Sequence, residues 1–175
     1  MSGTIPRKLS DHIKSDPRTD SEQPFKNSIF IHAEAGVVFQ GLVQSLNRTF
    51  TDMNIHLCSK FTEAEAYDND IQLVLIHASF IDNFSECAMR CRKRFPNASI
   101  TMMIDDNVPG LDELDSLFDS KVIQGLLPFN LKLDIWLAVI WLLLNGGEYY
   151  PSNISRSVDR IRADAYVQPQ GDGVV

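Results

Sequence analysis

The sequence lacks the features that mark membrane and secreted proteins. Its most apolar stretch, Leu133 to Leu144, contains one charged residue, Asp134. Twelve residues at about 1.5 Å of rise each give roughly 18 Å of helix, well short of a bilayer core. The first residues do not combine a basic start, an apolar middle and a small-residue cleavage site, so no signal peptide is predicted. We therefore expect no membrane contact and a cytoplasmic location.

Cysteine and positive charge are also scarce. The chain of 175 residues has three cysteines, an odd number without paired spacing, which is typical of a reduced protein rather than of a disulfide framework. Lys and Arg number 16 against 23 Asp and Glu, which gives a net charge of −7. This balance argues against a nucleic-acid-binding patch spread over the chain.

Motifs of enzymes and cofactor-binding proteins are missing as well. No Ser/Thr/Gly-rich phosphate loop follows the first predicted strand, where residues 33–37 read AEAGV. No Ser-His-Asp, Cys-His or Walker-type arrangement is present. We expect neither an enzyme nor a flavin carrier, and no cofactor.

The composition divides the chain into three parts. Residues 1–26 are polar, contain three prolines and show no sustained apolar period, which is typical of a disordered or loosely packed arm. Residues 27–151 are predicted to form one domain. Residues 152–175 are predicted to form a linker helix followed by a Gln/Gly/Pro-rich tail.

Apolar segments and helical patterns alternate along the domain. The predicted strands span residues 28–31, 55–58, 71–76, 99–104 and 122–127. The predicted helices span about 38–53, 62–69, 84–95, 109–118 and 133–144, the second opened by the T-x-x-E capping box of Thr62 and Glu65. This alternation predicts an α/β, flavodoxin-like (βα)5 three-layer sandwich, with a parallel sheet in the order 2-1-3-4-5.

The first and last predicted helices carry different apolar patterns. The first has one apolar face, with residues at every fourth position: Val38, Leu42, Leu46 and Phe50. The last, with Asn130 as its predicted N-cap and Gly146-Gly147 as its stop, is apolar nearly all round. A helix of that kind has two faces to cover, and a sheet covers only one of them.

The second apolar face of the last helix is predicted to contact another protein. A docked helix or a second copy of the chain would serve, and we expect a homodimer, with another regulator protein as the alternative partner. The residues expected to form this interface are Leu133, Trp136, Leu137, Ile140, Trp141 and Leu144.

The helices between these two carry polar clusters of their own. Cys87 and Cys91 are four residues apart and share a helix face, where core packing is the default for cysteine. A basic cluster and an acidic helix are both expected to be solvated surfaces; they consist of Arg90, Arg92, Lys93 and Arg94, and of Asp112, Glu113, Asp115 and Asp119.

The order of the elements, and the segment GLLPFNLKLDIWLAVIWLLLNGGEYYPSN at residues 125–153, resemble the receiver domains of response regulators. The resemblance is to LuxR-type transcription factors, whose receivers finish with a G-x-L-x-K segment, an apolar helix and a Gly-Gly turn. It covers about residues 27–151 and implies a role in transcription regulation. DNA would be contacted through a C-terminal helix-turn-helix domain that residues 152–175 are too short to hold, so we expect this chain to be the N-terminal part of a longer regulator.

The phosphorylation site that this resemblance implies is degenerate. Ala33 and Glu34 stand where receivers have two acidic Mg²⁺ ligands, and His77 stands where the phosphoacceptor aspartate ends the third strand. Ile104 or Asp105 lies at the position of the switch Ser/Thr, and Phe129 replaces the lysine that pairs with the phosphoryl group. Transfer to a side chain needs a carboxylate nucleophile, a metal and a cation. The resemblance therefore implies a pseudo-receiver that is not phosphorylated.

The altered pocket leaves two interpretations open. Glu34, His77 and Asp105 are expected to converge at the carboxyl ends of adjacent strands, where open α/β sheets bind ligands. Two carboxylates and an imidazole suit Zn²⁺. The same residues are also explained as what is left of a phosphorylation pocket, with polar side chains hydrogen-bonded to each other and to water. We predict the second and no metal. Phe129 is expected to fill the pocket and hold one conformation.

Two hypotheses for function follow. The leading one is a phosphorylation-independent regulatory domain that acts through homodimerisation or protein contact. The alternative is a small-molecule or metal-sensing domain that uses the altered pocket.

Overall fold

The computed structural model describes residues 27–66, 70–106 and 110–152. The predicted arm at residues 1–26 and the predicted linker and tail, apart from Ser152, lie outside these ranges. No helix of the described residues is long and apolar enough to cross a membrane.

A five-stranded parallel sheet has the order β2-β1-β3-β4-β5. Its strands are β1 (Ser28–His32), β2 (Asn54–Cys58), β3 (Ile71–His77), β4 (Ser99–Ile104) and β5 (Gly125–Pro128). The helices between them are α1 (Val37–Thr49), η1 (Phe61–Ala66), η2 (Ala78–Phe80), α2 (Phe84–Arg94), α3 (Leu111–Asp119) and α4 (Leu133–Leu144). The predicted flavodoxin-like fold is confirmed.

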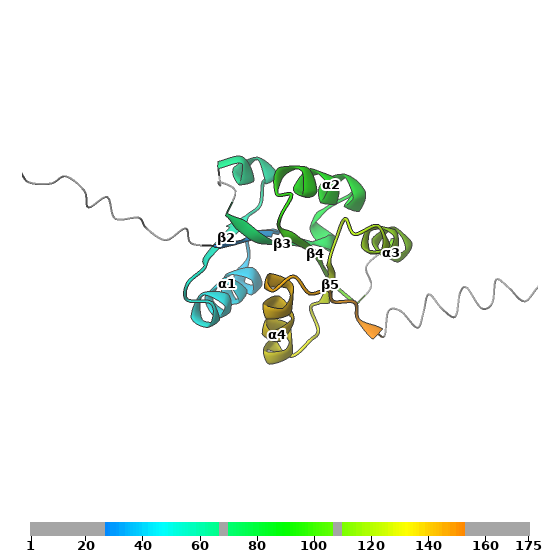
Figure 1. The fold of residues 1–175 in the computed structure, drawn as a ribbon. Coiled ribbons are helices and arrows are strands. Elements are labelled where there is room, and N and C mark those ends of the chain that lie inside the picture. The colour runs from blue at the N-terminus through cyan, green and yellow to red at the C-terminus, as the bar shows by residue number, and fades with distance from the viewer. Residues whose placement is uncertain (1–26, 67–69, 107–109, 153–175) are drawn as a thin grey trace, which may run out of the picture.

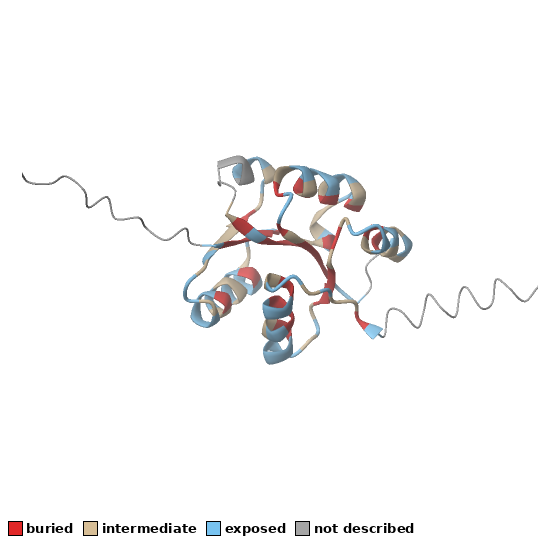
Figure 2. Ribbon diagram, viewed as in Figure 1, coloured by how far each residue is buried: buried red, intermediate tan, exposed pale blue. Residues whose placement is uncertain are grey.

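Alternation along the strands divides the core between the two faces of the sheet. In β1, Ile29 and Ile31 contribute to the core under α1 and α4, whereas Phe30 contributes to the core under α2 and α3. Figure 1 shows α1 and α4 side by side below the sheet, with α2 and α3 on its other side. The buried residues gather along the sheet and on the helix sides that face it (Figure 2). The described chain is therefore a three-layer sandwich.

Three predictions about the elements differ from the structure: the buried face of α1, the helix after β2 and the start of the last strand. On α1 the buried residues are Phe39 and Leu46, whereas Val38 is 69% exposed, because the face toward the sheet runs at alternating spacings of three and four residues. The segment after β2 is a 3₁₀ helix that ends at Ala66, rather than an α-helix. The last strand begins at Gly125 and not at residue 122, because Val122 and Ile123 donate their backbone N–H groups to Leu117 in a turn.

The N-cap predicted for the last helix is also wrong, whereas its predicted stop is confirmed. Lys132 is the N-cap of α4, without a side-chain cap, because the Asn130 side chain instead donates to Oδ1 of Asp106 at 2.6 Å. Asp134 in the first turn partly compensates the helix dipole. Gly146 adopts a φ of +77°, the left-handed conformation predicted for the stop.

The chain beyond α4 runs along the free edge of β5. The Tyr149 N–H donates to the Gln124 carbonyl at 3.0 Å, and the Leu126 N–H donates to the Tyr149 carbonyl at 2.9 Å. The Tyr150 hydroxyl donates to the Asp115 carboxylate on α3. Burial and this carboxylate raise the pKa of Tyr150 above its usual range. These contacts cover a sheet edge that would otherwise be open to strand addition.

Arg92 at the end of α2 ties that helix to two loops at the bottom of the sheet. Its guanidinium donates to the carbonyls of Pro96 at 3.0 Å, Ala98 at 2.8 Å and Val122 at 3.0 Å. It also donates to the Gln124 side-chain oxygen at 2.6 Å. The prediction that Arg92 belongs to a solvated surface is therefore wrong, because its planar fork matches three carbonyls from two loops.

Replacing Arg92 with Met is expected to lower the free energy of unfolding by about 1–3 kcal/mol, because two partly buried carbonyl groups lose a charged donor. Lys93→Met, at the exposed neighbouring position, is the matched control and is expected to change it by less than about 0.5 kcal/mol. Urea titrations followed by circular dichroism measure both. Equal losses in the two variants would contradict the assigned role of Arg92.

Candidate functional site

The candidate site lies where β1, β3, β4 and β5 end at their carboxyl termini. Ala33, just beyond β1, is fully buried and its N–H donates to the Cys58 carbonyl at 3.3 Å, whereas Glu34 beside it is exposed. His77 is the last residue of β3, and Asp105 and Phe129 directly follow β4 and β5. The parallel register brings these ends to one rim of the sheet.

A hydrogen-bonded group of three side chains occupies this rim. His77 Nε2 lies 3.2 Å from Asp105 Oδ2. A carboxylate only accepts, so the His77 ring donates. Ser79 Oγ donates to the same oxygen at 2.5 Å. One oxygen of the Asp105 carboxylate is therefore held by two donors from the β3 end.

Two phenylalanine rings pack against the other sides of His77. The ring centroids of Phe39 and His77 are 5.1 Å apart, as are those of Phe129 and His77. Phe39 and Phe129 meet edge to face at 5.5 Å. These distances are favourable for aromatic pairs. The rings of Phe39 and Phe129 therefore lie against His77 beside the β3 end.

Of the three residues predicted to converge, His77 and Asp105 meet and Glu34 does not join them in a metal site. The described residues contain no group of three or more His, Cys, Asp or Glu side chains that could hold a metal ion. A surface depression of about 440 Å³ remains on the far side of Phe129, lined also by Asp105, Asp106 and Asn130. The Asn130–Asp106 hydrogen bond spans one side of this depression.

Helix α4 divides its apolar residues between the core and the surface. Trp136 and Ile140 are 3% and 0% exposed, so these two predicted interface residues pack against the sheet instead. The burial follows from the spacing of 136, 139, 140 and 143 on one side of the helix. Leu133 and Trp141 are exposed and Leu137 and Leu144 half-buried, and these four remain candidates for an interface.

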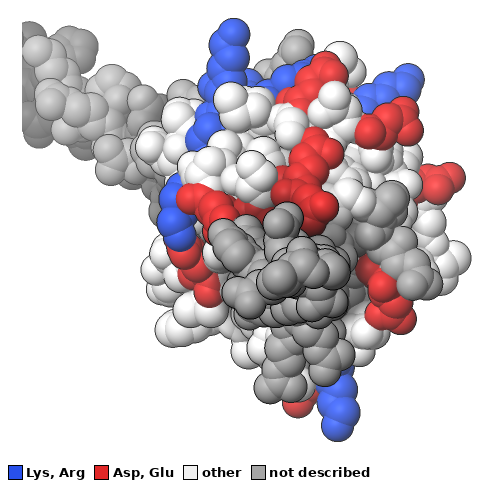
Figure 3. Space-filling view, turned by 90° about the vertical axis from the view of Figure 1, so that its right-hand side faces the viewer, with Lys and Arg blue, Asp and Glu red and all other residues white. Residues whose placement is uncertain are grey.

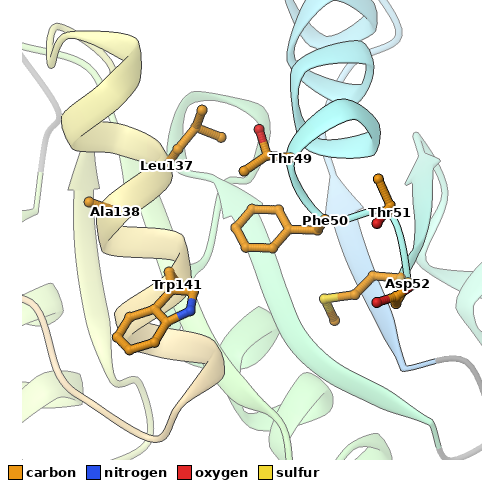
Figure 4. Close-up of a pocket in the computed structure, with 8 residues that line it drawn as sticks. Thr49, Phe50, Thr51, Asp52, Leu137, Ala138 and Trp141 are labelled. Carbon is orange, nitrogen blue, oxygen red and sulfur yellow. The ribbon is translucent and has the colours of Figure 1, made fainter.

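Two further residues on α4 belong to the exposed apolar face. Ile135 and Leu142 are 45% and 38% exposed, and Trp141 is 60% exposed. Beside this face a hollow of about 510 Å³ separates α4 from the end of α1 (Figure 4). In the close-up, the Trp141 indole and the Phe50 ring approach this hollow from the two sides. We call Leu133, Ile135, Leu137, Trp141, Leu142 and Leu144 the α4 outer face.

The acidic helix α3 is only partly the solvated surface that the sequence predicts. Glu113 Oε1 accepts from the N–H of Ser85 at 2.8 Å and from its hydroxyl at 2.6 Å, which ties α3 to the start of α2. Asp115 accepts from Tyr150. Acidic side chains are prominent on the side of the molecule at the right of Figure 1 (Figure 3).

Sequence reasoning missed four members of the candidate site. Phe39 was overlooked because the every-fourth-residue pattern selected Val38 for the buried face. Ser79 carried no signal in the sequence, and it reaches Asp105 because η2 turns the chain back toward β4. The Asp106–Asn130 pair could have been predicted, because polar residues that follow adjacent parallel strands lie at the same edge of the sheet.

Comparisons with known proteins place the fold among receiver domains. No protein-family model matches the sequence, and no curated protein matches it. A LuxR family DNA-binding response regulator from Silicibacter pomeroyi has a similar structure, with a TM-score of 0.58 and 15% identity over 71% of this chain and 97% of that one. A structure described as two RcsB dimers bound to two parallel DNAs gives a TM-score of 0.62 and 18% identity over 79% of this chain and 70% of that one.

A third similar structure carries the name of an enzyme. A protein described as an adenylate cyclase from Rhodopirellula baltica gives a TM-score of 0.54 and 10% identity over 81% of this chain and 98% of that one. Identities this low establish a shared fold and nothing about activity. The chain thus has the fold of response-regulator receiver domains, including those of LuxR-type regulators.

A histidine at the end of β1 lies in a second aromatic cluster near the rim. His32 is 7% exposed, and its Nδ1 donates to the Cys58 carbonyl at 3.2 Å. Its ring packs against Phe61 at 6.0 Å and Phe80 at 5.3 Å. Burial lowers the pKa of His32, and burial also lowers the pKa of His56 on β2.

These lowered pKa values make the folded protein less stable in acid. The unfolded chain takes up a proton at each histidine near the ordinary histidine pKa of 6.5, whereas the folded chain does so only at lower pH. The free energy of unfolding is therefore expected to fall as the pH drops through 6.5 and on to the lower folded-state pKa values. His32→Phe, which leaves the Cys58 carbonyl bonded to Ala33, is expected to reduce this loss.

Urea titrations between about pH 7.5 and 5 measure this dependence. His56→Gln is the matched variant for the second histidine, and the double variant is expected to be nearly independent of pH over the upper half of the range. If the free energy of unfolding of His32→Phe falls with pH as steeply as that of the unmodified chain, His32 is not a source of the pH dependence.

Proposed function

We propose that this chain is a pseudo-receiver: a regulatory domain that works without phosphorylation and acts by protein contact, through homodimerisation on the α4 outer face. The observation that carries the proposal is the combination of a filled site at the strand ends with an apolar helix face left open to solvent. The first removes the usual input of a receiver, and the second supplies an output.

The residues at the strand ends argue against phosphoryl transfer. The position expected for the phosphoacceptor holds His77, wedged between Phe39 and Phe129. Ala33 contributes no metal ligand, and no cation stands at Phe129. Asp105 is the nearest carboxylate, and one of its oxygens already accepts from two donors. A nucleophile, a metal and a cation are all needed for a stable phosphoaspartate, so this site does not support one.

The α4 outer face supports protein contact. Trp141 is 60% exposed. Tryptophan is among the residue types most enriched at the interface positions that dominate binding energy. Ile135 and Leu142 add further exposed apolar surface on the same helix. The hollow beside Trp141 offers space for a side chain of a partner. Large exposed apolar groups gathered on one helix are typical of interaction surfaces.

A second copy of the chain is the partner that we propose. RcsB, whose fold is similar, is described as a dimer on DNA. We carry over only the self-association. DNA contact is not proposed for the described residues, since the net charge of the chain is −7.

A small-molecule sensor is the second candidate function, favoured by the depression of about 440 Å³ between Asp105, Asp106, Phe129 and Asn130. Two carboxylates and an amide there suit a ligand with several hydrogen-bond donors. A metal is not proposed, because the described residues offer no group of three suitable ligands. A ligand that raises the melting temperature by mass action would favour this candidate.

Trp141→Glu is expected to weaken the dimer at least about thirtyfold, roughly 2 kcal/mol, because a charge is forced into an apolar interface. Sedimentation equilibrium over a dilution series measures the dissociation constant, and circular dichroism checks the fold.

Met89→Glu is the matched control, since Met89 is 55% exposed on α2, across the sheet from α4. It is expected to leave the dissociation constant unchanged. A chain that stays monomeric at every concentration would remove the proposed self-association. Equal weakening by both variants would remove α4 as its site.

A further inference from the structure

The layer that α1 and α4 form on one face of the sheet carries almost no charge (Figure 1). Each of these helices contains one charged residue, Arg48 on α1 and Asp134 on α4. On the other face of the sheet, α2 contains five charged residues and α3 contains four. Because charged residues are depleted at the centre of protein interfaces, this difference is typical of a layer that another protein covers.

Arg48 and Asp134 both lie on the outer side of this layer. Asp134 is exposed and precedes the exposed Ala138 by four residues and Trp141 by seven, so the three share one stripe of α4. Arg48 is exposed and follows the exposed Gly41 by seven residues on α1. Within the part of the chain that the structure describes, neither charge has an ion-pair partner. Two unpaired charges of opposite sign therefore interrupt an otherwise uncharged surface.

The two charges are separated along the layer as well as across it. Helices α1 and α4 run in the same direction, because a cavity of about 230 Å³ between Val38 and Leu133 joins their first halves. The hollow of about 510 Å³ beside Trp141 then joins the end of α1 to the second half of α4. Arg48 is in the last turn of α1, whereas Asp134 is in the first turn of α4. Arg48 therefore lies towards one end of the layer and Asp134 towards the other.

We infer that a second copy of the chain covers this layer, with Asp134 of each copy paired to Arg48 of the partner subunit. The inference rests on the homodimer proposed above and names the contacts that orient it. In a twofold dimer the same surface faces itself, so a residue at one place on it contacts the partner at another place. A twofold axis that lies in the interface, at right angles to the line from Arg48 to Asp134 and across its midpoint, brings each charge over the opposite one.

A second copy accounts for both charges at once. An unrelated partner would need two opposite charges of its own at matching positions, whereas symmetry supplies them in a dimer of this chain. The neighbouring charges agree with this arrangement. Lys132 is exposed at the N-cap of α4, close to Asp134, and the exposed Asp52 follows the end of α1, close to Arg48. The same rotation brings Lys132 towards Asp52 of the partner subunit, and these two charges are again opposite in sign.

The ion pairs orient the dimer, and the apolar residues of the α4 outer face supply its buried area. Opposite charges across an interface fix the register of the two partners, because other orientations place like charges together or bury a charge alone. Each pair occurs twice in a twofold dimer. A single substitution that reverses one charge therefore creates two repulsive contacts, which makes the arrangement accessible to measurement.

The test compares the Arg48→Glu chain, the Asp134→Arg chain and an equimolar mixture of the two. Each variant alone places like charges at both contacts, so its dissociation constant is expected to rise about tenfold or more. In a mixed dimer with one copy of each variant, both contacts again join opposite charges. The mixture is therefore expected to dimerise within about threefold of the unmodified chain. Sedimentation equilibrium over a dilution series measures all three, at an ionic strength of about 0.05 M where screening is weak.

Lys93→Glu and Asp112→Arg are the matched controls, because both residues are exposed on helices of the other face of the sheet. They are expected to leave the dissociation constant unchanged, alone and mixed. Circular dichroism checks the fold of each chain. If a charge reversal prevents folding, Arg48→Gln and Asp134→Asn take its place. Their mixed dimer regains one ion pair and is expected to be tighter than the dimer of either variant alone.

Three results would overturn the inference, and they separate it from the function proposed above. A dimer that Trp141→Glu weakens but neither charge reversal weakens would leave the α4 outer face as the interface without these ion pairs. A mixture no tighter than the two variants alone would show that Arg48 and Asp134 do not meet across the interface. A chain that is monomeric at every concentration would remove the ion pairs together with the self-association.

Discussion

The contact of Phe129 with His77 is the interaction on which the character of this molecule depends. Their ring centroids are 5.1 Å apart, and Phe39 closes the third side of the group. The rings sit at the carboxyl rim of the sheet, where α/β folds bind their ligands. With this space filled by apolar surface and with Asp105 held by His77 and Ser79, the side chains of the rim pack against one another. In the proposed function, the α4 outer face works as a constitutive surface that needs no input from this site.

Further contacts join the helices to the loops before β4 and β5 and to the edge strand β5. Arg92 joins the end of α2 to the loops before β4 and β5. The residues after α4 pair with β5, and Tyr150 bonds to Asp115 on α3. Each contact joins segments that are far apart in the sequence. These contacts fasten α2, α3 and the chain after α4 to the β5 end of the sheet.

The sequence predicts the architecture well because alternating apolar strands and helices have few packed solutions. It predicts the contacts of the site less well. His77, Asp105 and Phe129 were identified from their positions after strands, but Phe39 and Ser79 depend on where a helix begins and how a short turn bends. On α4, composition alone marked every residue except Asp134 as apolar, and only the three-dimensional packing separates the buried Trp136 from the exposed Trp141. Arg92 illustrates the same limit. The sequence of a basic run does not show which of its side chains donates to backbone carbonyl groups.

The most direct test of this account is an amide NMR spectrum of the chain recorded before and after addition of Mg²⁺ and a small acyl phosphate, together with the intact mass. A rim packed by Phe129 and His77 predicts an unchanged mass and no amide shifts at the ends of β3, β4 and β5. A mass increase of one phosphoryl group, accompanied by shifts at His77, Asp105 and Phe129, would contradict it.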